Sequence, residues 1–137
     1  MLTAEQLKAF CLEQPAAEET FPFSAELSVF KVAGKVFALC ALDEIPLRIS
    51  LKCDPDLAVR LREEHPAITA GYHLNKRHWN TVLLDGSVPK LLLREMIEDS
   101  YDLVVGGLTR KQQLLLDWAG LRAADRVEES HRLADEA

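Results

Sequence analysis

Apolar and polar positions alternate between residues 47 and 52: Leu47, Ile49 and Leu51 against Arg48, Ser50 and Lys52. Because successive side chains of a strand point to opposite faces, this alternation predicts a half-buried strand whose polar side chains point away from the helices. The β-rich runs 28–33 and 35–42 meet at Gly34, which predicts a hairpin. Together the three runs predict an antiparallel meander with four polar residues on its exposed face: Lys31, Arg48, Ser50 and Lys52.

Helical spacing of apolar residues predicts one helix before this meander in the sequence and one after it. Residues 3–13 begin with a capping-box pattern, Thr3 with Gln6, followed by a short apolar stripe. Residues 54–66 begin with Asp as N-cap and Pro at the first helical position, and the next proline ends the helix.

The strongest helical stripe follows Ser87, which we expect to be its N-cap. Its apolar residues lie on one helical face: Leu93, Met96, Ile97, Tyr101 and Val104. Gly106-Gly107 ends this helix, and Thr109 begins another helical stretch. Two further strands, 67–72 and 78–84, are expected on either side of the loop Asn75-Lys76-Arg77.

The expected elements follow the order α-β-β-β-α-β-β-α, which predicts an α+β domain over residues 1–117. Strands that are neighbours in sequence usually pair, so we expect about five strands in a mixed or antiparallel sheet with helices packed on one face. Residues 18–23 are expected to form an irregular link whose aromatic rings cover an edge of the core. Residues 118–137 are expected to be a helical C-terminal extension that buries little.

The composition fits a folded protein, because 48% of the residues are apolar. The chain has neither an apolar run of the roughly 20 residues that a membrane span needs nor a secretory signal, so we expect a cytoplasmic protein that does not contact membranes. Three cysteines stand far apart and without a CxxC motif: Cys11, Cys40 and Cys53. We expect free thiols and no disulfide.

The net charge of −6 hides an asymmetry along the chain. Residues 1–47 hold three Lys/Arg and seven Asp/Glu, residues 48–78 hold six and four, and residues 79–137 hold seven and eleven. The middle segment alone is basic, and it contains the aromatic and polar stretch 71–81. Turn-forming residues within that stretch predict a basic loop presented by the strand behind it, which is a common way to build a binding site.

The residues of this loop allow more than one interpretation. Trp79 can fill the core or, if exposed, provide a stacking surface for single-stranded nucleic acid. His73 and His78 can share a metal, but their spacing is unspecific. The chain contains no phosphate-binding glycine loop and no nucleophile elbow, so we expect a non-enzymatic protein without catalytic residues, metal or cofactor.

Four segments, taken in order, resemble the MmcQ/YjbR family of small bacterial proteins over about residues 1–117: Gly34 to Leu39, Leu51 to Pro55, Gly71 to Val82 and Ser100 to Val104. Ser24 and Ser50 stand where the family pattern has Gly and Asn. The resemblance implies a CyaY-like α+β fold, related in shape to frataxin and to the "double wing" DNA-binding domain of a phage transcription factor. It also implies a cytoplasmic protein of a kind described as DNA-binding.

From these observations we expect a DNA-binding domain that uses a basic sheet face and the loop. The residues expected to contact DNA are Arg48, Lys52, His73, Asn75, Lys76, Arg77 and His78. One alternative is a frataxin-like metal or protein-partner role of the acidic N-terminal quarter, which contains Glu13, Glu18, Glu19 and Glu26. The other is a site for a small phosphorylated ligand at the 71–81 loop. The oligomeric state is left open by the sequence.

Overall fold

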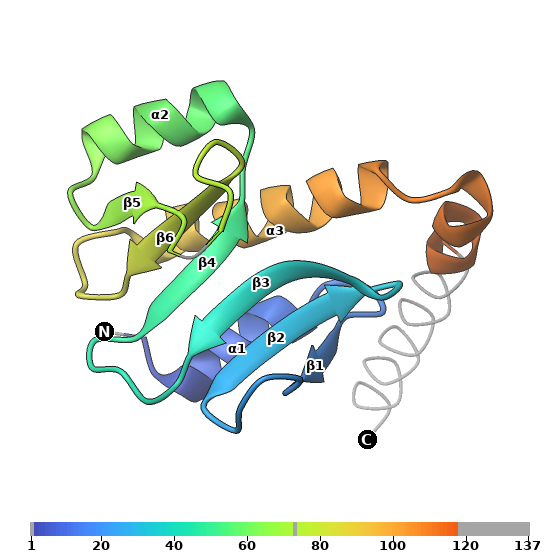
Figure 1. Ribbon diagram of the computed structural model, residues 1–137, viewed down its shortest axis with the longest axis horizontal. Coiled ribbons are helices and arrows are strands. Elements are labelled where there is room, and N and C mark those ends of the chain that lie inside the picture. The colour runs from blue at the N-terminus through green and yellow to red at the C-terminus, as the bar shows by residue number, and fades with distance from the viewer. Residues whose placement is uncertain (1, 73, 118–137) are drawn as a thin grey trace, which may run out of the picture.

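Six strands form one antiparallel sheet in the computed structural model, which describes residues 2–72 and 74–117 (Figure 1). The strands are β1 (Glu18–Thr20), β2 (Leu27–Val32), β3 (Lys35–Ala41), β4 (Arg48–Lys52), β5 (Ile68–Ala70) and β6 (Trp79–Leu83). Their order across the sheet is β1-β2-β3-β4-β6-β5, and every neighbouring pair is antiparallel. The α+β class is therefore confirmed, with six strands in place of about five.

The helices are α1 (Ala4–Leu12), α2 (Pro55–Glu64) and α3 (Lys90–Gly106), and residues 110–117 are also helical. α3 packs against β3 and β4, α1 packs against α3, and α2 packs against β5 and β6. Figure 1 shows α1 and α3 behind the sheet and residues 110–117 standing away from it. Within the described part of the chain, no helix is long and apolar enough to cross a membrane.

Two of the predicted helix starts are confirmed by their hydrogen bonds. The capping box of α1 is complete, with reciprocal bonds between Thr3 and Gln6. The carboxylate of Asp54 accepts from the backbone N–H of Leu57 at 3.2 Å and caps α2. These bonds satisfy backbone donors that the first turn of a helix leaves without intrahelical partners.

The prediction that Ser87 caps the third helix is wrong. α3 begins at Lys90 after Pro89. The backbone N–H and the hydroxyl of Ser87 instead donate to the carboxylate of Asp85, at 2.9 and 2.6 Å. This turn follows β6, and proline at 89 favours an extended residue before it, so the helix starts later than the polar cap signal suggests.

The expected irregular link over 18–23 is also wrong in part, because Glu18–Thr20 forms the edge strand β1. Its residues are polar, as is common in a short strand that protects a sheet edge, and they give no apolar pattern to detect. The rings of Phe21 and Phe23 do not cover the core, since these residues are 45% and 76% exposed.

The central position of β6 is the main departure from sequence order. β4 and β5 are consecutive strands, yet β6 lies between them and pairs with both. Because β5 has three residues and β6 has five, the longer and more buried strand occupies the interior of the sheet. The β4–β6 pair places Ser50 opposite Thr81 and Lys52 opposite Trp79, which assembles the site described below.

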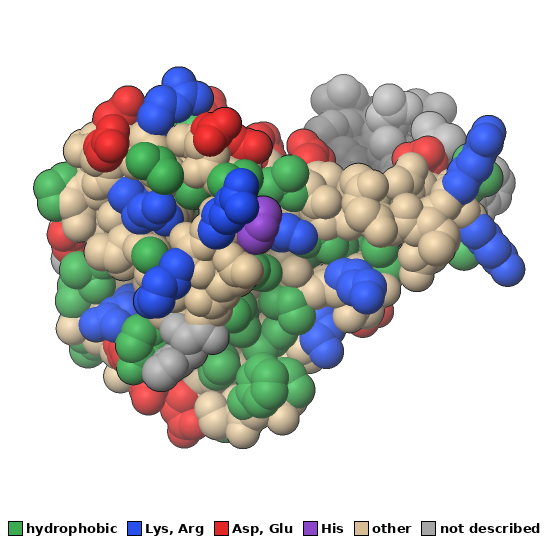
Figure 2. Space-filling model, turned by 45° about the horizontal axis from the view of Figure 1, so that its top comes forward, with side chains coloured by type: hydrophobic (Ala, Val, Ile, Leu, Met, Phe, Trp, Pro, Cys, Tyr) green, Lys and Arg blue, Asp and Glu red, His purple; other side chains and the backbone are tan. Residues whose placement is uncertain are grey.

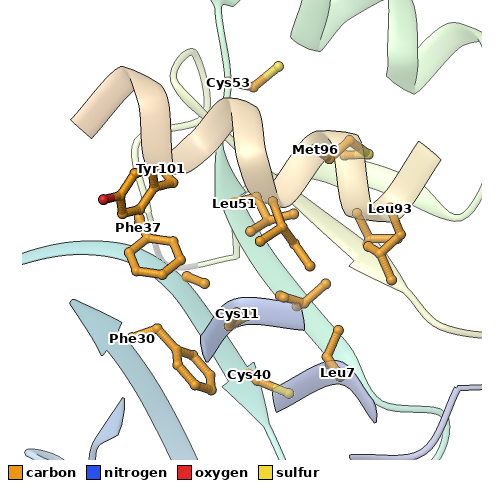
Figure 3. Close-up of a cluster of buried hydrophobic side chains, with 14 of the residues drawn as sticks. Leu7, Cys11, Phe30, Phe37, Cys40, Leu51, Cys53, Leu93, Met96 and Tyr101 are labelled. Carbon is orange, nitrogen blue, oxygen red and sulfur yellow. The ribbon is translucent and has the colours of Figure 1, made fainter. Parts of the chain in front are cut away.

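The core lies between the sheet and the helices (Figure 3). The ring of Phe37 meets that of Tyr101 edge-on, with centroids 5.5 Å apart. The hydroxyl of Ser100 donates to the carbonyl of Phe37 at 2.6 Å and accepts from the N–H of Lys52 at 2.9 Å, so α3 is joined to β3 and β4. All three cysteines are buried free thiols, as predicted: Cys11, Cys40 and Cys53.

Candidate functional site

The face of the sheet opposite the helices is called the open face here. Ile49 and Leu51 of β4 are 0% and 1% exposed and belong to the core, so the alternating residues of β4 lie on the open face. The predicted register is confirmed. Arg48 is exposed and Lys52 is half-buried, whereas Ser50 is buried rather than exposed as predicted.

Ser50 is buried because the segment after β5 lies close to the open face at this point. Its hydroxyl lies 2.8 Å from that of Thr81, its partner on β6. Thr81 Oγ1 also accepts from the backbone N–H of Tyr72 at 3.0 Å. This bond fixes Tyr72 beside the two hydroxyls, while the residue as a whole remains 61% exposed.

Two hollows adjoin Tyr72 on the open face. The first, the leucine pocket, has a volume of about 220 Å³, and its apolar wall includes Leu27, Leu39 and Leu74. The second, the cationic hollow, has a volume of about 260 Å³, and Lys76 and Thr69 lie on its wall. Both are also lined by Arg48, Tyr72 and Thr81, so they share a boundary.

Arg48 stands at that boundary. Its guanidinium carbon is 5.9 Å from the centroid of the Tyr72 ring, a cation–π arrangement. Its Nε lies 2.9 Å from Oε2 of Glu44, which also lines the leucine pocket. The two charges are in contact, but Oε2 is shielded from solvent and accepts no well-aligned hydrogen bond among the described residues. The 2.9 Å separation makes Arg48 and Glu44 an ion pair, so this oxygen already faces a cation.

The loop between β5 and β6 is built by its own polar side chains. Oδ1 of Asn75 accepts from the N–H groups of Arg77 and His78, at 2.9 and 3.3 Å. Arg62 of α2 donates to the carbonyl of Lys76 at 3.1 Å and to Oδ1 of Asn80 at 2.9 Å. The side chains of Lys76 and Arg77 are exposed, so the loop holds its backbone in place and leaves two cations facing solvent.

The expected DNA-contacting residues fall into three groups. Arg48 and Lys76 come together at the cationic hollow. Lys52 lies opposite Trp79, and the N–H of the next residue donates to the carbonyl of His78 at 2.8 Å, so Lys52 and His78 are close along the strand pair. Arg77 and Asn75 lie in the loop, where the carbonyl oxygen of the Asn75 side chain is already used. His73 lies outside the described residues.

Trp79 combines features of both interpretations offered by the sequence. It begins β6, as predicted, and is half-buried. It alternates with Asn80, whose side chain is fully buried and donates to the carbonyl of Ala58 in α2. Trp79 therefore points to the open face beside Lys52 and is not a residue of the main core.

Several residues of the site carry no sequence signal. Arg62 and Glu44 were not singled out, and Thr81 and Ser50 were not expected to pair, because they are 31 positions apart. Their association depends on the insertion of β6 next to β4. The charge asymmetry of residues 48–78 and the turn-forming, aromatic stretch 71–81 were the sequence signals that pointed to this region.

Figure 2, with the α2 side of Figure 1 brought forward, shows Lys and Arg side chains scattered across the middle of the visible face. Asp and Glu side chains gather mainly toward its margins. A protein with a net charge of −6 thus presents a locally basic surface. Such a surface attracts anionic ligands despite the overall charge.

Other clusters offer less for catalysis or metal binding. In the acidic N-terminal quarter, Glu13 pairs with Arg94 at 2.9 Å and Glu19 with Lys8 at 3.3 Å. No three potential metal ligands gather within the described residues. Burial raises the pKa of the Cys53 thiol to about 11, so this thiol is protonated at neutral pH.

A one-sided antiparallel sheet with a basic, aromatic open face defines the structural class of the chain, a small α+β protein. By sequence the chain belongs to the YjbR family, whose model matches residues 12–103. The protein is 41% identical to the uncharacterised protein YbdF of Escherichia coli O157:H7 over 80% of this chain and 89% of that one. It is 34% identical to the uncharacterised protein YjbR of Escherichia coli K12 over 84% and 98% of the two chains.

Solved structures agree with this assignment. The crystal structure of Deinococcus radiodurans protein DR2400 is 46% identical, covers 85% of this chain and 89% of its own, and has a TM-score of 0.81. A protein from Pseudomonas syringae is 29% identical over 74% of this chain and 98% of its own, with a TM-score of 0.66. The family resemblance noted in the sequence is confirmed, and these relatives bring no assigned activity with them.

Proposed function

We propose that the chain binds DNA through its open face and the 71–81 loop, without catalysing a reaction. The observation that carries this proposal is the cationic hollow, where Arg48 of β4 and Lys76 of the loop line one depression. Cations that converge from separate segments provide a seat for a backbone phosphate. Lys52 of β4 and Arg77 of the loop add further positive charge outside the hollow.

Strands and a loop would make the contacts, in the manner of β-ribbon DNA-binding proteins. Asn75 serves mainly to shape the loop, since its side-chain oxygen accepts two backbone hydrogen bonds. Lys76 and Arg77 can then approach phosphates without a large loss of loop entropy. The protonated thiols support a non-enzymatic role, because the thiolate is the reactive form of cysteine.

A second candidate function is a site for a small phosphorylated ligand at the same hollow. Its volume of about 260 Å³ and its two cations suit a single phosphate group attached to a small molecule. DNA remains the better fit because Lys52 and Arg77 lie outside the hollow and extend the basic surface beyond one small ligand.

Fluorescence anisotropy with labelled duplex DNA at several salt concentrations tests the proposal. Contacts by Lys52, Lys76 and Arg77 predict a log–log slope of roughly −2 to −3, at about −0.9 per phosphate. The double substitution Lys76→Ala with Arg77→Ala should weaken binding to all sequences and reduce the slope by about two contacts. The matched control is Arg110→Ala with Lys111→Ala, the same charge change on a helix that stands away from the sheet.

If both double variants lose DNA affinity equally, the loss comes from the change in net charge, and the loop is not part of the DNA interface. Absence of binding even at low salt would reject DNA as the ligand. A small phosphorylated compound that binds wild-type protein, and not the Lys76/Arg77 double variant, would then favour the second candidate.

A further inference from the structure

The leucine pocket is a depression that phosphate binding alone does not explain. Its lining is mainly apolar and includes Leu27, Leu39, Ala41, Leu74 and the ring of Tyr72. Its volume of about 220 Å³ exceeds the roughly 150 Å³ of an apolar cavity that takes up benzene. The pocket therefore has room for a single ring or a short alkyl group.

The pocket and the cationic hollow share a boundary but differ in character. Arg48, Tyr72 and Thr81 line both depressions. Lys76 lines only the hollow, and Leu39 lines only the pocket. An apolar compartment beside a cationic one is complementary to a small ligand that has one apolar and one anionic part.

Arg48 keeps donors for an anion although it is paired with Glu44. The 2.9 Å contact uses Nε of the guanidinium, and the terminal nitrogens Nη1 and Nη2 donate no hydrogen bond to a described residue. The ammonium of Lys76 likewise has no ion pair within the described part of the chain. Glu44 lines the pocket and not the hollow, so the anionic part of a ligand is favoured in the hollow.

A hydroxyl donor lies beside this boundary. Ser50 and Thr81 carry two hydroxyl protons, and one of them lies in the 2.8 Å contact between the two oxygens. The other has no acceptor among the described residues, because the second bond at Thr81 Oγ1 comes from the N–H of Tyr72. Since Thr81 lines both depressions, the free donor is placed to meet an oxygen that links the apolar part of a ligand to its phosphate.

We propose that the open face binds a small phosphate monoester, with its apolar group in the leucine pocket and its phosphate in the cationic hollow. The ligand class is an aryl or short-alkyl phosphate, and the pocket selects by size and apolar character. This inference goes beyond DNA binding and gives a chemical class to the small ligand considered above as the second candidate. Arg48 and Lys76 hold either this phosphate or one of DNA, so the two ligands exclude each other; that exclusion rests on the proposed function.

The test is an NMR titration of ¹⁵N-labelled protein with three probes: phenyl phosphate, inorganic phosphate and phenol. Phenyl phosphate should bind at least roughly tenfold more tightly than inorganic phosphate, because burial of about two methylene equivalents of apolar surface is enough for that ratio. It should exceed phenol by a similar factor, because phenol lacks the charge that the hollow attracts. Equal affinity for phenyl phosphate and either other probe would overturn the two-part site.

Ala41→Leu fills the leucine pocket without a change of charge. Ala41 is half-buried, lines the pocket and does not line the hollow. The variant should bind phenyl phosphate no more tightly than inorganic phosphate, and its affinity for inorganic phosphate should equal that of the wild type. Ala9→Leu, on the exposed side of α1 and away from both depressions, is the matched control and should keep the preference. Thermal melting of each variant checks that it is folded.

Lys76→Ala removes the ammonium from the hollow, and Arg77→Ala is its matched control. Both residues are exposed, carry one positive charge and lie in the same loop, but Arg77 does not line the hollow. Phenyl phosphate affinity should fall roughly tenfold in the Lys76 variant, the loss expected for one hydrogen bond to a charged group, and change less than about twofold in the Arg77 variant. Equal losses in the two variants would overturn the hollow as the seat of the phosphate.

The outcomes separate this inference from the proposed function. Phenyl phosphate that binds with these sensitivities supports the two-part site even if duplex DNA does not bind, and DNA binding that depends on both Lys76 and Arg77 stands even if the pocket test fails. Where DNA does bind, phenyl phosphate at a concentration that saturates the wild type should displace the duplex, and the same concentration should not displace it from Ala41→Leu. Simultaneous binding of both ligands to the wild type would overturn the exclusion.

Discussion

Gly71 shows how a single position constrains the site. It pairs with Trp79 through a 2.8 Å backbone hydrogen bond, and a Cβ at this position would lie 2.7 Å from the Cβ of Trp79. Since neither atom is the end of a flexible side chain, the strands would have to separate. We predict that Gly71→Ala costs about 1–3 kcal/mol in the free energy of unfolding, the range for overpacking.

Gly106, at the end of α3, is the matched control because a Cβ there meets no atom within 4 Å. Gly106→Ala should be neutral or stabilise by up to about 0.5–1 kcal/mol, as alanine favours helix. Urea unfolding measures both changes. A Gly71 variant as stable as the Gly106 variant would show that β5 and β6 separate without cost at this point.

The thiols allow a prediction of pH dependence. Burial raises the pKa of Cys53 to about 11 and that of Cys40 to about 12, from 9.0, and it raises the pKa of Cys11 as well. The protonated thiol is the form favoured by folding, so its contribution to stability is fully present below the unfolded pKa near 9 and is lost as the pH rises through the folded values.

We therefore expect the melting temperature to fall above pH 9, and a disulfide reagent at pH 8 to react with the thiols only after unfolding. Cys53→Ala should remove the part of the alkaline decline that comes from this thiol. Rapid reaction of the native protein at pH 8 would contradict the burial of the thiols.

Single residues were predictable where their chemistry alone marks them. Lys52, Lys76 and Arg77 were singled out as candidates from the local excess of positive charge, and the free thiols were predicted from the spacing of the cysteines. The pairing of the Ser50 and Thr81 hydroxyls was not predictable, because a serine and a threonine on separate strands have no sequence pattern that indicates a shared hydrogen bond. Their role depends on which strands pair.

At the scale of elements, strands and helices with a periodic apolar pattern were predicted correctly, whereas the polar edge strand β1 was not. The alternation in β4 gave the correct face for Ile49 and Leu51, because burial on one side of a strand fixes its register. Glu18–Thr20 has no apolar residue, so its pairing with β2 could not be inferred locally. The position of β6 depends on tertiary packing of α2 and β5, which lie between it and β4 in sequence.

Arg62 links an element to the site. It reaches from α2 to Oδ1 of Asn80, a fully buried residue, and to the carbonyl of Lys76. We predict that Arg62→Ala costs about 1–3 kcal/mol, because Oδ1 of Asn80 loses a charged donor while it remains buried. The loop should also lose its fixed position, and DNA affinity should fall.

Arg60→Ala is the control, since Arg60 lies exposed on the same helix and makes no hydrogen bond or ion pair within the described residues. Both variants lose one positive charge. Denaturant unfolding and the salt-dependent DNA titration are measured on each. Equal behaviour of the two variants would mean that Arg62 acts by charge and does not position the loop.

At the scale of the whole molecule, the two faces of the sheet have different roles. Helices cover one face of the sheet and form the core together with that face, which leaves the other face to carry cations, hydroxyls and the Tyr72 ring. The composition and periodic helices were enough to predict this layered α+β design. The assembly of the open face was not predictable, because residues from β4, β6 and the loop meet there only after the sheet has formed.

The location of the core predicts how the protein tolerates truncation. The buried core cluster runs from Leu7 to Val104, and among the described residues Leu116 is the last one packed against it. Residues 121–137 lie outside the described residues and lack a sustained apolar stripe in the sequence. We predict that deletion of 121–137 leaves a cooperatively melting domain that retains the open face, with a melting temperature within a few degrees of the full chain.

Differential scanning calorimetry of the truncated and full chains measures this, and the duplex DNA titration on both chains checks the open face. The Arg110/Lys111 region remains in the shortened chain, so the charge control for the loop still applies. Broad, non-cooperative melting would place the tail in the core or in an obligate dimer, and dependence of the melting temperature on protein concentration would identify the dimer.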